Sequence, residues 1–416
     1  MTSASASESH LSNVWFSVTP LKVATGKGCW VTTTDGEEYL DFAAGIAVNS
    51  TGHAHPHVAK AIAEQAQRFI HAQVNVYKHD LLEPLAAKLS ELSPGAIDTF
   101  FYANSGAEIT EAAVKLAKQV TKRPHTIVFS GSFHGRTHMA MAMTTSKTGY
   151  RSGHFALPAG VFVAPYPDPL AQDQDAAVAD ALRGFDHLLK SMTAPDETAA
   201  VILEPVLGEG GYIPAPHGFI TGLVERCRQH GIMFIADEVQ SGFGRTGKMF
   251  AVEHYGIEPD IICMAKGIAS GFPFAALGTR RELDDKWPTG SHGGTYGGNA
   301  MGCAAALATI EVMSEPGFLQ NVVDRGAQLQ AGIRELQQEH DVIAQVRGFG
   351  LMVGTEFHDA PRVAAIQKHC LEEGHMILMN AGTYGKCLRW MPPLVVSERE
   401  IDLGLAAFAA ALKATA

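Results

Sequence analysis

The chain has no long apolar run and no excess of positive charge. None of its apolar stretches approaches the roughly 18 residues of a membrane-spanning helix, and its 416 residues carry a net charge of −11. A membrane span is therefore not expected, and an acidic chain is a poor partner for nucleic acid or an anionic membrane. The polar start lacks the apolar region of a secretion signal, so residues 1–11 are predicted to form a mobile tail.

Cysteine is scarce, and its spacing excludes two common uses. The six cysteines contain no C-x-x-C pair and no metal-ligand spacing. They are typical of reduced thiols in a cytoplasmic protein rather than of a disulfide framework. The densest histidine cluster, His53 to His57, lies in a turn without supporting cysteines or carboxylates. No metal site is expected there.

The composition is that of a folded enzyme, with 46% hydrophobic and 18% charged residues. Beyond Val58, apolar strand candidates alternate with helical patterns, which predicts a mainly parallel α/β sheet. The seven expected strands are Thr99–Ala103, Thr126–Phe129, Val161–Ala164, Ala200–Glu204, Met233–Asp237, Ile261–Met264 and Phe274–Gly278.

Both ends of the chain differ from this alternating middle. Near the N-terminus, Asp35-Gly36 between two strand-like runs indicates a hairpin. After about Glu315 the pattern predicts two helices and two short strands. These are helix Leu319–Glu339, strands Gly350–Phe357 and Leu388–Met391, and helix Glu398–Lys413.

Two charged residues follow apolar runs in the second half of the chain. Asp237 and Lys266 lie 29 residues apart, close to the length of a βαβ unit, so both can reach the carboxyl edge of one parallel sheet, where ligands bind. A lysine there loses water, which lowers its pKa toward a nucleophilic amine that can form a Schiff base. A lysine for the aldehyde and an acid for the ring nitrogen are what pyridoxal phosphate requires.

Two further strand ends carry residues suited to a cofactor. Ser105, Gly106 and Ala107 open a helix, whose free N–H groups suit a phosphate, although a plain helix cap is equally common. Phe133 follows another strand and can stack on a planar ring, or be buried in the core. Arg136 suits bidentate recognition of a carboxylate, or a surface ion pair.

The run Asp237-Glu-Val-Gln-Ser-Gly-Phe-Gly-Arg-Thr-Gly247, followed by Pro259-Asp-Ile-Ile-Cys-Met-Ala-Lys266-Gly267, resembles the signature of class III aminotransferases. These are pyridoxal-phosphate-dependent enzymes of fold type I. The resemblance runs from about Trp15 to the C-terminal helix. It implies a large seven-stranded domain, residues 58–314, and a smaller α+β domain built from residues 12–57 and 315–416. It also implies a homodimer, or a pair of dimers.

The resemblance assigns the cofactor-binding residues. Lys266 would form the Schiff base and shuttle the proton, and Asp237 would bond the ring nitrogen. Phe133 and Val239 would cover the two ring faces, with His134 beside them. Gln240, oriented by Glu204, would bond the ring hydroxyl. The phosphate would lie at Ser105, Gly106 and Ala107, and Thr295 would reach it from the neighbouring subunit. The proline usual after the asparagine of that loop is Ala300 here.

Within this family the chain is most similar to 4-aminobutyrate aminotransferases. That implies that Ile46 lines the substrate pocket and that Arg136 binds the carboxylate remote from the reacting amine. Glu209 would pair with Arg389 whenever no α-carboxylate is bound. Without the resemblance, Ile46 would be interpreted as a residue of the hydrophobic core, and Arg389 as an ordinary surface or interface arginine.

The expected reaction moves the amino group of an ω-amino acid to 2-oxoglutarate. The donor that the resemblance favours is 4-aminobutyrate. One alternative is another class III aminotransferase with an ornithine, acetylornithine, diamine or β-amino acid donor. A second is an isomerase of the glutamate-semialdehyde aminomutase type, which needs no external acceptor. A binding protein without activity is disfavoured by the intact Lys266 and Asp237.

Overall fold

The computed structural model describes residues 10–154 and 156–415. Most of the expected N-terminal tail, residues 1–9, lies outside the described residues. Within the described residues, no helix is long and apolar enough to cross a membrane. All six cysteines are free and buried.

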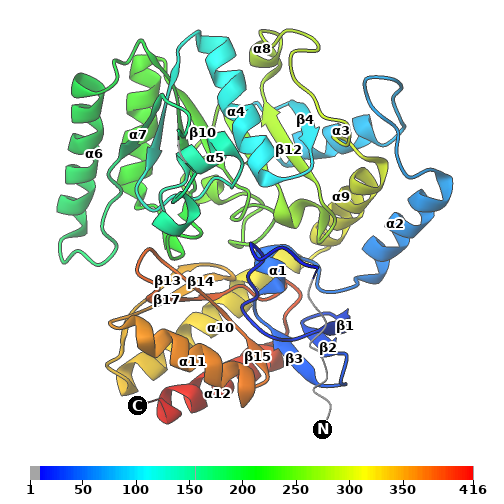
Figure 1. The fold of residues 1–416 in the computed structure, drawn as a ribbon, viewed down its shortest axis with the longest axis vertical. Helices are drawn as coiled ribbons and strands as arrows, with labels where there is room; N and C mark the ends of the chain where they lie inside the picture. The colour runs from blue at the N-terminus through cyan, green and yellow to red at the C-terminus, as the bar shows by residue number, and fades with distance from the viewer. Residues whose placement is uncertain (1–9, 155, 416) are drawn as a thin grey trace.

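A seven-stranded sheet forms the centre of the larger part of the molecule (Figure 1). Its strands lie in the order β4-β12-β11-β10-β7-β5-β6, and β12 runs antiparallel to both neighbours while the remaining pairs are parallel. The strands are β4 (Thr99–Ala103), β5 (His125–Phe129), β6 (Val161–Ala164), β7 (Thr198–Leu203), β10 (Met233–Asp237), β11 (Ile261–Met264) and β12 (Ala275–Thr279). Each expected strand is confirmed within two residues of its predicted bounds.

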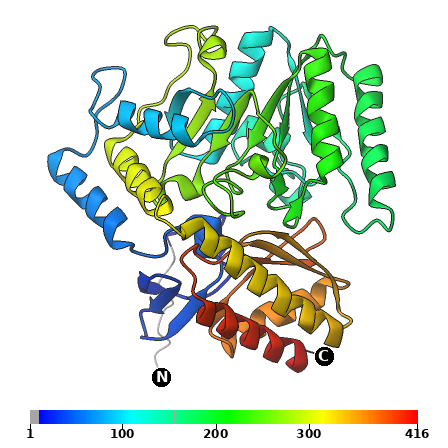
Figure 2. The ribbon, with the colours of Figure 1, turned by 180° about the vertical axis from the view of Figure 1, so that it is seen from behind.

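The central strands are mostly apolar because helices cover both faces of the sheet. Every residue of β7, β10, β11 and β12 is buried, as expected for strands without a solvent face. Helix α4 (Gly106–Thr121) packs against β7 and β11, and α7 (His217–His230) packs against β10 and α6 (Gln174–Ser191). Figure 2 shows α6 and α7 together at one side of the sheet. The other elements of this part are α2 (Pro56–Arg68), α3 (Leu82–Leu92), α5 (His138–Met143), α8 (Arg281–Asp284), α9 (Ala300–Met313), β8 (Val206–Leu207), β9 (Ile213–Pro214) and the 3₁₀ turns Thr148–Tyr150, Ala251–His254 and Lys266–Ala269.

The two ends of the chain meet in a smaller domain below the large sheet (Figure 1). One of its sheets has the order β1-β2-β3-β15 and therefore joins N-terminal strands to a C-terminal one. The second sheet has the order β13-β14-β17-β16. The elements are β1 (Val23–Lys27), β2 (Trp30–Thr33), β3 (Glu38–Asp41), α1 (Ala44–Ala47), α10 (Phe318–Glu339), β13 (Ile343–Phe349), β14 (Met352–Phe357), α11 (Ala360–Glu372), β15 (Met376–Ile377), β16 (Met379–Ala381), β17 (Cys387–Trp390) and α12 (Glu398–Ala414). The hairpin at Asp35-Gly36 is confirmed by the antiparallel pairing of β2 with β3, whereas the domain limits at residues 57 and 315 stay predictions.

Candidate active site

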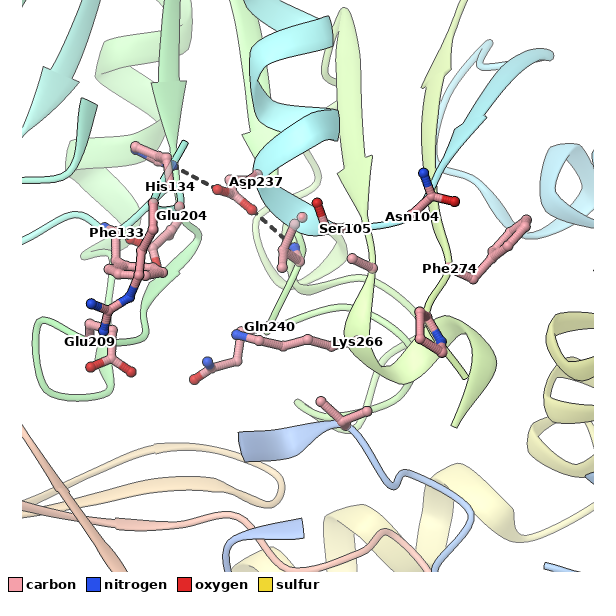
Figure 3. Close-up of a pocket in the computed structure, with 18 of the residues that line it drawn as sticks. Asn104, Ser105, Phe133, His134, Glu204, Glu209, Asp237, Gln240, Lys266 and Phe274 are labelled. Carbon is pink, nitrogen blue, oxygen red and sulfur yellow. Dashed lines mark hydrogen bonds and ion pairs between the residues drawn. The ribbon is translucent and has the colours of Figure 1, made fainter. Parts of the chain in front are cut away.

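A cavity of about 390 Å³ lies at the carboxyl edge of the large sheet, with Val48 of the smaller domain in its wall. This volume is within the usual range for small-molecule sites. Most of its walls come from the segments that follow the carboxyl ends of β4, β5, β7, β10 and β11 (Figure 3). The predicted residues that line it are Ser105, Gly106, Ala107, Phe133, His134, Arg136, Glu204, Glu209, Asp237, Val239, Gln240 and Lys266.

Lys266 begins a 3₁₀ turn directly after β11, at a positive φ of 47°. A non-glycine residue in this region is strained, and such strain often marks a functional site. The turn is braced from the smaller domain, because the backbone N–H of Thr51 donates to Ser270 Oγ at 2.9 Å. Burial lowers the pKa of Lys266 to about 8, although the nearby Glu209, Glu204 and Asp237 charges act in the opposite direction.

Asp237 ends β10 and is 3% exposed. Its Oδ2 lies 2.7 Å from Nδ1 of the buried His134, and its Oδ1 accepts a hydrogen bond from the Val239 N–H at 3.1 Å. With the carboxylate ionised, the hydrogen of His134 must lie on Nδ1. The pair therefore fixes the orientation of a carboxylate facing the cavity, as Figure 3 shows.

Glu204 connects the segment after β7 to the loop after β5. One of its oxygens accepts from the Phe133 N–H and the other from the Gly208 N–H, both at 2.8 Å. Burial raises the pKa of Glu204 to about 7. Close by, Gln240 has a buried Oε1 with no hydrogen-bond partner among the described residues. A buried polar atom of this kind calls for a ligand or an ordered water.

The N-terminus of α4 faces the same cavity. The Ser105 side chain caps the helix by accepting from the Glu108 N–H at 3.3 Å. A Cβ on Gly106 would lie 2.8 Å from Cγ1 of Val239, so only a glycine fits between this turn and the segment after β10. The first-turn N–H groups of a helix have no partner within the helix and can bind an anion.

Arg389 and Glu209 form an ion pair at the side of the cavity nearest the smaller domain. Arg389 lies on β17 and is 2% exposed. Burial disfavours the Glu209 anion, but the charge and hydrogen bond of Arg389 outweigh it and lower the pKa of Glu209. Arg389 does not itself line the cavity; it lies behind Glu209.

Arg136 is exposed and no ion pair joins it to a carboxylate within residues 10–154 and 156–415. Its guanidinium lies 4.3 Å from the centre of the Tyr150 ring.

Tyr150 was not predicted as a site residue, because nothing in its local sequence distinguishes it. Asn104 and Phe274, which do line the cavity, were likewise missed.

Besides Arg389, two predicted residues lie outside the cavity wall. Ile46 is 39% exposed and has a φ of 66° in a left-handed turn. Thr295 is exposed in the glycine-rich loop before α9. The pocket-lining role of Ile46, and the delivery of Thr295 to a neighbouring subunit, stay predictions.

These residues fit pyridoxal phosphate. The chemistry of the set is complete in one cavity: an amine with a lowered pKa, an oriented carboxylate, an aromatic face, and a helix N-terminus with room for a phosphate. The unpartnered Gln240 oxygen offers one more polar contact to such a group.

The comparisons with known proteins agree with this set. The family described as "Aminotransferase class-III" matches residues 11–412. The chain is 40% identical over 395 residues to 5-aminovalerate aminotransferase DavT of Pseudomonas putida, covering 93% of this chain and 92% of the relative. It is 38% identical over 395 residues to 4-aminobutyrate aminotransferase GabT of Escherichia coli, with the same coverages. It is 41% identical over 383 residues to the acetylornithine aminotransferase of Methanothermobacter thermautotrophicus, covering 92% and 91%.

The fold has a close counterpart among solved structures. A crystal structure of an amine transaminase from an uncultivated Pseudomonas species, in a PLP-bound form, superposes with a TM-score of 0.90 at 27% identity. The match covers 98% of this chain and 99% of the other.

Fold and site together define a pyridoxal-phosphate-dependent enzyme of fold type I. Within that class, the chain belongs to the class III aminotransferases. Its substrates are accordingly amino acids and keto acids.

Proposed function

We propose that this enzyme transfers the amino group of 4-aminobutyrate to 2-oxoglutarate, giving succinate semialdehyde and glutamate. The observation that carries the proposal is the Glu209–Arg389 pair. An unpaired buried charge is costly, and a donor that reacts at a terminal amine brings no carboxylate to Arg389. Glu209 supplies the opposite charge to Arg389 in that half-reaction. Arg136, which no ion pair joins to a carboxylate among the described residues, can bind the donor's remote carboxylate.

Four parts of the cavity wall have a definite task in this proposal. Lys266 would hold the cofactor aldehyde, Asp237 the ring nitrogen, Gln240 the ring hydroxyl, and the α4 N-terminus the phosphate. When bound, pyridoxal phosphate supplies an electron sink that acidifies the substrate carbon beside the amine. With its pKa near 8, Lys266 Nζ is partly unprotonated near neutral pH and can accept and return the proton at that carbon.

The same pocket must also accept glutamate, which carries a carboxylate beside its amine. Arg136 would hold the remote carboxylate of both substrates, whereas Glu209 would have to leave Arg389 before the α-carboxylate of glutamate could bind there. We therefore expect Arg136→Ala to damage both half-reactions. Arg389→Ala should mainly damage the glutamate half, and Glu209→Ala the 4-aminobutyrate half. Equal losses in both halves for these last two variants would contradict this exchange of partners.

A second donor, 5-aminovalerate, is supported by the 40% identity to DavT. It differs from 4-aminobutyrate by one methylene, and a hydrophobic pocket discriminates a methylene by only about 10- to 200-fold. The test is single-turnover absorbance with 4-aminobutyrate, 5-aminovalerate and acetylornithine, followed by 2-oxoglutarate and quantification of glutamate. A higher kcat/KM for 5-aminovalerate or acetylornithine would replace the proposed donor. Turnover of glutamate semialdehyde without a keto acid would indicate the isomerase.

A further inference from the structure

Tyr150 contacts Arg136 and also Glu209, the ion-pair partner of Arg389, although no family motif identified it. It ends the 3₁₀ turn Thr148–Tyr150, and its hydroxyl donates to Glu209 Oε2 at 3.0 Å. Glu209 Oε1 accepts from Arg389. The two oxygens of one carboxylate are thus held by two different donors, Tyr150 after α5 and Arg389 on β17.

The other contacts of Tyr150 lead to Arg136. The Arg136 guanidinium lies 4.3 Å from the centre of the Tyr150 ring, within cation–π distance. That ring also packs edge-to-face with Phe133, with the centroids 5.3 Å apart. One side chain therefore contacts the residue expected to bind the remote carboxylate and the residue expected to respond to the α-carboxylate.

The backbone around Glu209 is hydrogen-bonded to the smaller domain, so we expect a change at this residue to be a movement of its side chain. Its carbonyl oxygen accepts from the Gly382 N–H at 3.0 Å, and the carbonyl of Gly211 accepts from Arg347 Nη2 at 2.8 Å. Both partners belong to the smaller domain. The free energy of turning Glu209 away from Arg389 consequently depends on the contacts of its carboxylate, of which the Tyr150 hydroxyl is one.

We propose that Tyr150 is a specificity-determining residue, whose hydroxyl holds Glu209 on Arg389 and so favours donors that carry no carboxylate beside the reacting amine. The inference rests on the proposed function in one respect: it requires one substrate without an α-carboxylate and one with it. Any donor with a terminal reacting amine serves, so a change of preferred donor leaves the inference testable. Burial and the Glu209 charge raise the pKa of Tyr150 to about 12, which keeps the hydroxyl protonated and able to donate.

The central variant is Tyr150→Phe, which removes the hydroxyl and keeps the ring under Arg136. Losing one hydrogen bond to a charged group changes an equilibrium by roughly tenfold. In holoenzyme single-turnover assays, the ω-amino donor half should slow by about 10-fold. In the same assays, the half-saturating concentration of glutamate should fall by up to about 10-fold, since Glu209 leaves Arg389 more easily. Tyr150→Leu, which also removes the ring, should raise the half-saturating concentrations of both substrates relative to Tyr150→Phe.

Two controls separate this role from a general loss of structure. Tyr166→Phe removes a buried hydroxyl that donates to the Ile213 carbonyl at 3.3 Å outside the cavity, and it should leave both halves unchanged. In a Glu209→Ala background, Tyr150→Phe should have no further effect on the donor half, because the carboxylate that it contacts is gone.

Opposite shifts in the two half-reactions, lost in the Glu209→Ala background, would support the inference. Equal losses in both halves, no change, or a larger loss with glutamate would overturn it. None of these results bears on whether 4-aminobutyrate is the preferred donor, which is decided by the comparison of donors with the unaltered enzyme.

Discussion

Among single residues, Asp237 is held in place by His134 and by the Val239 N–H. Asp237→Asn should leave the cofactor bound but remove the charge that keeps the ring nitrogen protonated. We expect turnover to fall by at least about 10²-fold, the scale of losing one preorganised electrostatic group. Steady-state assays with the cofactor absorbance as a measure of occupancy check this.

The neighbouring Glu238 supplies a matched control for that substitution. It is fully buried, but it bonds Ser241 and the Val252 N–H rather than facing the cavity. Burial raises the pKa of Glu238 to about 7, so Glu238→Gln imitates a form that is populated near neutral pH. It should keep turnover within a few-fold of the unaltered enzyme. Near-normal turnover in Asp237→Asn would remove Asp237 from the mechanism.

Lys266 makes the stability of the cofactor-free protein depend on pH. Its pKa falls to about 8 in the folded chain, against about 10.4 in an unfolded one. Between these values the unfolded chain binds more protons, so the free energy of unfolding rises with pH. Lys266→Met lacks this dependence and should be more stable at pH 7, by up to about 3 kcal/mol. Urea unfolding at pH 7 and pH 10 measures both proteins. A stability gap that does not shrink at pH 10 would show that Lys266 is not desolvated.

At the scale of elements, the proposed phosphate site at the α4 N-terminus can be tested by adding a side chain at Gly106. Gly106→Ala would place a Cβ 2.8 Å from Val239 Cγ1. Overpacking typically costs about 1–3 kcal/mol, so we expect pyridoxal phosphate affinity to fall by about 10-fold or more. Gly218→Ala is the matched control. Gly218 also lies in the first turn of a helix, α7, but is exposed, and its Cβ would approach Val178 no closer than 3.7 Å. Equal affinity in both variants, measured by titrating the apoproteins, would contradict a phosphate site at α4.

The sequence predicts best those strands that are buried at every position, because both of their faces require apolar side chains. β10 and β11 are buried at every position, so a continuous apolar run marks both of them. β13, β15 and β16 were not predicted. β15 and β16 have two and three residues, and β13 carries Gln345, Arg347 and a glycine between its apolar positions. The polar side chains of β13 are accommodated only by tertiary contacts, such as the ion pair of Arg347 with Glu356 at 2.6 Å.

The site residues could likewise be predicted from the residues alone only where the local sequence was enough to place them. Lys266 and Asp237 follow apolar runs and could be placed at one sheet edge from spacing alone. Glu209, Arg136 and Arg389 came from the family resemblance, because 180 residues separate Glu209 from Arg389. Tyr150 has no motif, and its contact with Glu209 exists only after the chain has folded. The backbone conformation of Ile46 could not be predicted either, because a β-branched residue is rarely found in a left-handed turn.

At the scale of the whole molecule, we propose that the active unit is at least a dimer. Thr295 is exposed and lies outside the cavity wall, and the family resemblance delivers it across a two-fold interface. A Thr295→Ala chain mixed with a Lys266→Ala chain should then form hybrid dimers with one intact site, and activity should reappear. Hybrids verified by mass that stay inactive would place both residues in the site of the same chain.

Reduction with borohydride tests the central claim, that Lys266 carries the cofactor, most directly. The purified holoenzyme should absorb visible light as a Schiff base, and reduction should abolish that absorbance. Peptide mapping should then find the pyridoxyl group on Lys266. A label on another lysine, or no label on a protein that retains its pyridoxal phosphate, would contradict the assignment.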